Sequence, residues 1–219
     1  MTDHPPANDA DRAETPPRPA AVTFVTTEHF TLQGARSSTI AEATGRASMF
    51  LGTVTGGLVA LGLIATAAGV GAAFYAFGLI LLPTLAFLGL VTFDRVLQSG
   101  IEDHGYAQRI ARLRGYYFQY APELVDHLLS VPAYDRLRIQ GLKGGAWQKF
   151  LTVAGMVGMV TAVLAGSGAG LLAALVAGHR LVAGLGVGVL IAVVVAVVLL
   201  RIEAAAWYRA RTTPLFPEQ

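Results

Sequence analysis

The sequence predicts an all-α integral membrane protein with four transmembrane helices in two hairpins and amphipathic helices on the cytoplasmic side. Composition is the first reason: 54% of the 219 residues are hydrophobic and 14% are charged, whereas charged residues make up about 25% of an ordinary soluble protein. The position of the charges is the second reason, because they are absent from long continuous stretches. Lipid rather than water is therefore expected to solvate much of the surface.

The first hairpin is predicted over residues 47–93, which contain no Asp, Glu, Lys, Arg or His in 47 positions. A helix needs about 20 apolar residues to cross a hydrocarbon core about 30 Å thick, so this stretch is long enough for two crossings. Gly69 and Gly71 supply the break between them.

The second hairpin is predicted over residues 150–203. Uncharged stretches of 29 and 20 residues, at 150–178 and 181–200, flank His179 and Arg180, which would mark the turn. The first of these helices ends either in the glycine-rich run at 166–170 or at Gly178, and the sequence leaves both alternatives open.

The basic residues predict the orientation. Of the 16 Lys and Arg residues, 15 lie before the first span, between the second and third, or after the fourth, and only Arg180 lies at a hairpin tip. Basic residues near membrane spans favour the cytoplasmic side. We expect a multi-pass protein of the bacterial cytoplasmic membrane with both termini and the middle segment in the cytoplasm.

The segments outside the hairpins are predicted from composition and periodicity. Residues 1–25 are rich in Pro and acidic residues and are expected to be a disordered tail. Residues 26–46 are expected to form an interfacial helix, in which Glu42 and Arg46 make an i,i+4 pair. Residues 204–219 are expected to be a cytoplasmic tail.

The middle segment, residues 94–149, is predicted to be helical and cytoplasmic. Tyr106, Ile110, Leu113 and Tyr117 fall on one stripe of a helix that continues out of the second span. Basic and aromatic residues near a span are typical of contact with lipid headgroups or with a partner, and their closeness to the membrane argues against nucleic acid. The predicted contact residues are Arg109, Arg112, Arg114, Tyr116, Tyr117, Trp147 and Lys149.

Small residues recur every four positions in two of the spans. Such stripes allow two helix backbones to approach closely, and they join either helices of one bundle or separate copies of the chain. We expect a homo-oligomer. The predicted packing residues are Gly52 and Gly56 in the first span and Gly184, Gly188, Ala192 and Ala196 in the fourth.

No pattern indicates catalysis, a metal or a cofactor. The chain has no Cys, and it lacks the His-Glu-x-x-His, Gly-x-Ser-x-Gly and phosphate-loop motifs. Glu102, Asp103 and His104 are consecutive, and consecutive helical side chains diverge. Glu123 and His127 share a face but supply only two ligands, fewer than a metal site requires.

The spans also lack ionisable residues, which proton-coupled carriers and pumps usually retain. We therefore expect a non-enzymatic membrane protein that self-associates and presents its cytoplasmic helices to a protein partner or to anionic lipid. The alternative is an oligomeric pore or small-solute channel. Its polar lining would come from Thr53, Thr55, Thr152 and Thr161.

Three segments carry a resemblance to a known family: LQGARSSTIAEATGRASMFLG, FGLILLPTLAFLGLVTFDRVLQSGIEDHGYAQRIARLRGYYF and WQKFLTVAGMV. They resemble a family of four-helix integral membrane proteins of actinobacteria, and the likeness covers residues 28–201. It implies the topology and supplies no catalytic residue. More loosely, paired spans with flanking cytoplasmic helices are similar to the SLATT membrane effectors of bacterial conflict systems, a likeness that implies a pore.

Overall fold

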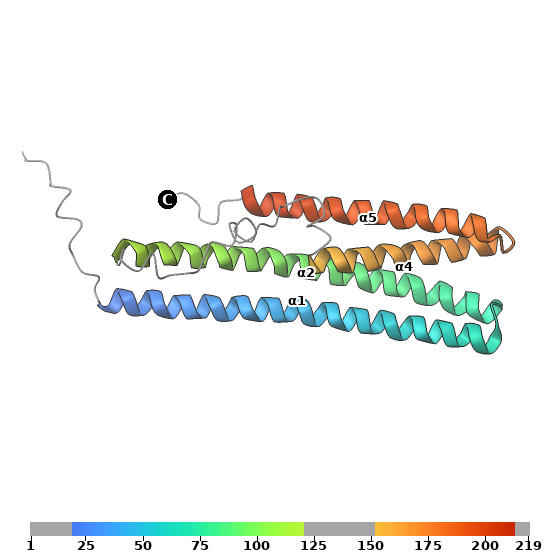
Figure 1. Cartoon of the computed structure of the whole chain (residues 1–219), viewed down its shortest axis with the longest axis horizontal. Helices are drawn as coiled ribbons and strands as arrows, with labels where there is room; N and C mark the ends of the chain where they lie inside the picture. The colour runs from blue at the N-terminus through green and yellow to red at the C-terminus, as the bar shows by residue number, and fades with distance from the viewer. Residues whose placement is uncertain (1–18, 121–151, 213–219) are drawn as a thin grey trace, which may run out of the picture.

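The computed structural model describes residues 19–120 and 152–212, and this part of the chain is all-helical, without strands. Each of its four helices is long and apolar enough to cross a membrane, as the two charge-free regions predicted. Figure 1 shows the helices as two long antiparallel hairpins. The helices are α1 (Pro19–Ala68), α2 (Ala72–Tyr120), α4 (Val153–Val176) and α5 (Leu181–Thr212).

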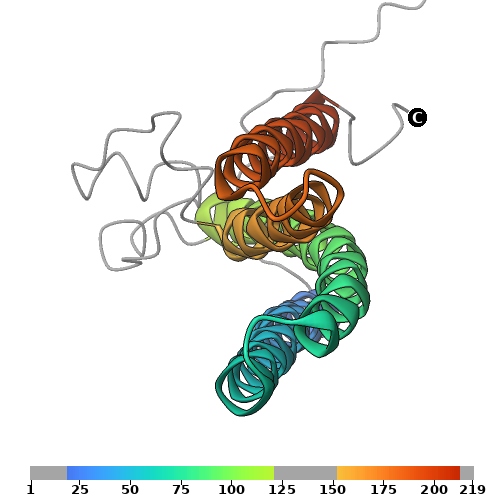
Figure 2. The same cartoon turned by 90° about the vertical axis from the view of Figure 1, so that its right-hand side faces the viewer.

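The helices form a curved row rather than a closed bundle. Each packs mainly on its neighbours in the order α1, α2, α4, α5, as the end-on view in Figure 2 shows. Only 11% of the most apolar window is buried in α1 and in α5, against 39% in α2 and in α4. The two edge helices therefore each leave one broad apolar face uncovered by the rest of the described chain.

Both hairpin tips turn through residues with positive φ. Gly69 has φ 72° in the first tip, and Gly178 and His179 have φ 68° and 66° in the second. The backbone N–H of Gly178 donates to the carbonyl of Leu175, and that of His179 donates to the carbonyl of Ala174. This pair of bonds is a Schellman motif. The third span accordingly runs through the glycine-rich run at 166–170 and ends late, at Val176.

The first two helices are much longer than a membrane crossing requires. With 50 and 49 residues, each spans roughly 75 Å at 1.5 Å per residue, whereas the hydrocarbon core is about 30 Å thick. Both continue past the charge-free stretch on the same side (Figure 1). We call this two-helix extension, residues 19–46 of α1 and 94–120 of α2, the stalk.

The continuous helices correct three predicted boundaries. Residues 19–25 belong to α1 rather than to a disordered tail, with a Pro in the first position of the helix, where its missing N–H has no cost. Residues 26–46 are not a separate interfacial helix but continue the first span without a break. Residues 204–212 continue α5 rather than forming a tail. The predictions for residues 1–18, 121–151 and 213–219 lie outside the described residues.

The stripe predicted on α2 lies along the stalk. Ile110 is buried, and Tyr106 and Leu113 are half-buried. Between the stalk and the hairpin tips, the core forms where α1, α2 and α4 meet. Its best-buried large side chains include Phe50 and Val157. This core reaches into the start of the stalk, where Ala43, Val96 and Leu97 belong to it.

Candidate functional site

The small-residue stripe of α5 faces α4 within the same chain. A Cβ atom added to Gly188 would lie 3.0 Å from the carbonyl oxygen of Gly166, and one added to Gly184 would lie 2.8 Å from Cβ of Ala174. Ala192 also packs against Gly166, because a Cβ there would be 2.6 Å from the Ala192 methyl group. The close approach of α4 and α5 thus uses these glycines internally.

The remaining predicted packing residues divide between the inside and the outside. Ala196 borders a narrow crevice together with Phe93 and Gly158, inside the row of helices. Gly52 and Gly56 are exposed on α1, and a Cβ added to either would meet no atom within 4 Å. Of the two predicted stripes, the one on α1 is left uncovered by the rest of the described chain.

The four threonines predicted to line a pore do not share a face. Thr53 and Thr55 are exposed on α1, Thr161 is fully buried, and Thr152 precedes α4. The hydroxyl groups of the first three donate to the carbonyl four residues earlier in their own helix, at 2.9, 2.9 and 2.7 Å. These side chains therefore form no polar lining within one chain.

The three consecutive polar residues at the base of the stalk diverge, as helix geometry predicts. The Asp103 carboxylate accepts hydrogen bonds from Nε and Nη2 of Arg36 at 2.6 and 3.3 Å, which ties α2 to α1. The His104 ring contacts the Trp207 ring edge-on, with centroids 5.7 Å apart, and Glu102 is exposed. Within the described ranges, no three His, Cys, Asp or Glu side chains could hold one metal ion.

His104 lies outside the charge-free stretches, between α2 and α5. Burial lowers its pKa below the ordinary value, the Arg211 guanidinium lowers it further, and Asp103 acts in the opposite direction. The imidazole is 2.9 Å from the Gln108 amide. The neutral ring is therefore the form that packs between Trp207 and the stalk.

We expect acidification to loosen this contact. A pKa lowered on folding means that the unfolded chain binds more protons, so the contribution of His104 to stability is full above about 6.5 and falls as the pH drops below it. Thermal unfolding of the protein in nanodiscs should show a lower Tm at about pH 5.5 than at about pH 7.5. The difference should shrink in His104→Gln; an unchanged pH difference in that variant would exclude this role.

The predicted contact residues lie far along the stalk. Arg109 and Arg112 are exposed, and Arg114 and Tyr116 are half-buried. The Arg109 guanidinium lies 5.9 Å from the ring centroid of Tyr106. Of the other predicted contacts, Trp147, Lys149 and the side chain of Tyr117 lie outside the described part of the chain, as do Glu123 and His127.

The tip residue His179 joins the two hairpins. Its Nδ1 atom is 3.1 Å from the hydroxyl oxygen of Tyr75, and the two rings meet edge-on with centroids 5.1 Å apart. Tyr75 belongs to the first turns of α2 and is buried. The sequence indicates His179 only as the end of a span. Its contact with Tyr75, 104 residues earlier, is made by the packing of the two hairpins. Arg180 is exposed at the same tip.

Glu203, which no sequence pattern marks as a functional residue, carries a carboxylate that is only 1% exposed. The Thr152 hydroxyl donates to its Oε1 atom at 2.9 Å, and the Thr152 oxygen in turn accepts the backbone N–H of Gly155 at 2.8 Å. This places the carboxylate near the N-terminus of α4, where the helix dipole stabilises negative charge. The available signal was its spacing: Glu203 falls four residues after Leu199, on the buried stripe of α5.

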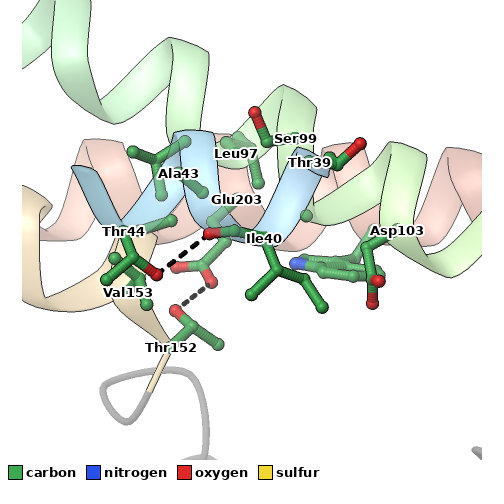
Figure 3. A pocket seen from close by; sticks show the side chains of 14 residues that line it. Thr39, Ile40, Ala43, Thr44, Leu97, Ser99, Asp103, Thr152, Val153 and Glu203 are labelled. Carbon is green, nitrogen blue, oxygen red and sulfur yellow. Dashed lines mark hydrogen bonds between the residues drawn. The ribbon is translucent and has the colours of Figure 1, made fainter. Parts of the chain in front are cut away.

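Glu203 lies in the wall of a cavity of about 170 Å³. All four helices line this space, at the level where the stalk begins. Figure 3 shows the Glu203 carboxylate between Thr44 of α1 and Thr152 at the start of α4. Trp207 of α5 and the first two residues of α4, Val153 and Ala154, also line it.

The polar contacts of the described chain thus include the Arg36–Asp103 ion pair of the stalk, the contact of His179 with Tyr75 at the tips and the buried carboxylate of Glu203 in the cavity wall. No family model matches this sequence, and comparison with curated proteins and with solved structures found no similar chain.

Proposed function

We propose that this chain is a non-enzymatic, multi-pass protein of the bacterial cytoplasmic membrane that self-associates and holds its stalk in the cytoplasm as a docking element for a protein partner. The length of the stalk is the observation that carries the proposal. A hairpin that served only to cross the bilayer would need about 20 residues per helix, and α1 and α2 have 50 and 49.

The boundary of the membrane is inferred from charge. The charge-free stretches of α1 and α5 border on Arg46 and Arg201. That of α2 borders on Asp94, which Arg95 follows directly. All three arginines are exposed. Arginine near a span end favours the cytoplasmic side. This supports an orientation with the stalk and both termini inside the cell and the two hairpin tips outside.

A protein partner suits the far end of the stalk better than lipid does. Arg109 follows Asp94 by fifteen residues, which is roughly 23 Å along a helix, whereas headgroups extend only about 5–8 Å beyond each side of the hydrocarbon core. Phe24 and Phe30 of α1 are 74% and 70% exposed in the stalk. Exposed aromatic and arginine side chains are enriched in protein interfaces.

Self-association is assigned to the outer face of α1. Its exposed Gly52 and Gly56 allow a second helix to approach closely in lipid, where helices associate through packing rather than through the hydrophobic effect. The four threonines expected to line a pore do not share a face of the chain. This favours self-association by helix packing over the oligomeric pore and over a pore-forming conflict effector.

Single cysteines test the orientation without background, because the chain has no Cys of its own. In intact cells, a membrane-impermeant maleimide should label Val70→Cys at the first tip, and it should label Ser38→Cys in the stalk only after the membrane is opened. Both positions are exposed. The reverse pattern would place the stalk outside and remove the proposed cytoplasmic docking role.

The same approach tests self-association. Oxidation of membranes should join two copies through Gly52→Cys or Gly56→Cys, and it should not do so through Val189→Cys, a matched position that is 62% exposed on the other edge helix. Monomers at both α1 positions, or equal crosslinking at Val189→Cys, would contradict an interface on α1.

A further inference from the structure

The last part of α5 continues beyond its charge-free stretch. That stretch ends at Leu200, and the helix runs on without a break from Arg201 to Thr212. Figure 1 shows this part of α5 extending past the start of α4, on the side of the stalk. We call residues 201–212 the α5 end. The proposed membrane insertion places Arg201 at the surface of the bilayer, so the α5 end begins among the lipid headgroups.

One exposed stripe of the α5 end is basic and aromatic. Arg201, Tyr208 and Arg211 follow one another at i, i+7 and i+10, a spacing that keeps them on one side of a helix. Both arginines are exposed, and Tyr208 is 71% exposed. Glu203, the acidic residue of α5, is buried and lies two positions after Arg201, which is about 200° around the helix. The stripe therefore presents positive charge away from the carboxylate of its own helix.

The other arginines at this level lie next to carboxylates. Nε of Arg46 donates to the Glu42 carboxylate at 2.9 Å, and Arg95 directly follows Asp94. No carboxylate of the described ranges pairs with Arg201. Uncompensated positive charge at the proposed membrane boundary is therefore found on α5 rather than on α1 or α2.

The direction of α5 turns its side chains back toward the bilayer. Helical side chains tilt toward the N-terminus of their helix, and the N-terminus of α5 lies at the hairpin tip. The Arg211 guanidinium lies 5.9 Å from the ring centroid of Trp207, four residues earlier. The level of Trp207 is roughly 9 Å beyond Arg201, whereas Arg211 itself begins about 15 Å beyond it. The second guanidinium therefore lies within about a Debye length of the headgroups.

We propose that the α5 end binds the phosphate group of an anionic phospholipid, with the Arg201 guanidinium as the main contact, Arg211 as a second charge and Tyr208 at the polar boundary. A guanidinium donates two parallel hydrogen bonds to a phosphate, and tyrosine is enriched at the membrane–water interface. The lipid site lies at the edge of the row opposite to α1. It rests on the proposed membrane insertion, but on neither the proposed orientation nor the proposed self-association.

Native mass spectrometry of the whole protein in detergent tests the site, because it resolves the binding of single lipids. The first phosphatidylglycerol should bind at least fivefold more tightly than the first phosphatidylcholine, whose headgroup has no net charge. Arg201→Gln should weaken phosphatidylglycerol binding by about fivefold, the value expected for one basic side chain near an anionic surface. Arg109→Gln, at an exposed arginine far along the stalk, should leave it unchanged. Equal affinities for the two lipids, or equal losses in the two variants, would overturn the proposal.

A second pair of variants neutralises Arg201 without removing it. Ala205→Glu places a carboxylate four residues after Arg201, where the two side chains form an ion pair, and it should weaken phosphatidylglycerol binding as Arg201→Gln does. Ala111→Glu adds the same charge at an exposed alanine of the stalk and should have no effect. Unchanged lipid affinity in Arg201→Gln and Ala205→Glu would overturn the proposal and leave the stripe to a protein partner. Because both sides of the protein are accessible in detergent, this result is independent of the cysteine labelling that tests the orientation.

Discussion

Replacing Gly166 by Ala is expected to push α4 away from α5 and to lower the free energy of unfolding by about 3 kcal/mol, the upper range for overpacking a filled interior. An added Cβ would run into the carbonyl oxygen of Gly188 and would lie 2.6 Å from the Ala192 methyl group. A backbone carbonyl cannot rotate out of the way as a side chain does. The loss corresponds to roughly 6–12 °C in Tm for a chain of this size.

Gly186→Ala is the matched control. Gly186 lies on α5 between two glycines that face α4, yet a Cβ there would meet no atom within 4 Å. Because Ala is a better helix former than Gly, this variant should unfold at the same temperature or slightly higher. Thermal unfolding of both variants in one detergent gives the comparison, and equal Tm values would show that α4 and α5 do not pack through Gly166.

Replacing Phe50 by Ala is expected to have the second large effect, because it empties the site where α1 meets α2 and α4. Phe50 is 2% exposed, and its Cζ atom lies 2.9 Å from the position that a Cβ of Gly89 would take. Truncating a buried Phe costs about 3–5 kcal/mol, largely through lost packing contacts. The variant should weaken the attachment of α1 to α2 and α4 at this level, while the Arg36–Asp103 ion pair of the stalk remains.

Met49 provides the control for Phe50. It is the preceding residue of the same helix, but it is 76% exposed, so Met49→Ala should leave Tm nearly unchanged. Unfolding monitored by heat and by protease accessibility of α1 separates the two variants. Similar behaviour of Phe50→Ala and Met49→Ala would mean that α1 does not hold its place through this contact.

The number and position of the apolar helices were predictable because they follow from a local rule. Twenty uncharged apolar residues suffice to define a candidate span, and the uncharged runs at 47–93, 150–178 and 181–200 contain four. The first tip was also predictable, since Gly69 takes a positive φ that suits glycine. The end of the third span stayed open, because only the bonds from Gly178 and His179 back to α4 decide it.

The stalk was not predictable in the same way. Residues 26–46 carry charges and small residues that are also typical of a helix lying on a membrane surface. What distinguishes the two arrangements is the pairing of α1 with α2, made by contacts such as Arg36 with Asp103, 67 positions apart. The same holds for Glu203, whose carboxylate accepts a hydrogen bond from Thr152, 51 positions away.

The two small-residue stripes have the same sequence spacing but different surroundings in the fold. Gly52 with Gly56 and Gly184 with Gly188 have the same four-residue spacing, and spacing within one helix reports only that these residues share a face. Which face a neighbouring helix covers depends on how α4 and α5 dock, and that docking buries the second stripe and leaves the first open. Local composition is enough to define four apolar helices with charge kept near their ends. The pairing of α1 and α2 in the stalk and the burial of the Glu203 carboxylate beneath it follow from the fold, because both involve contacts between residues distant in sequence.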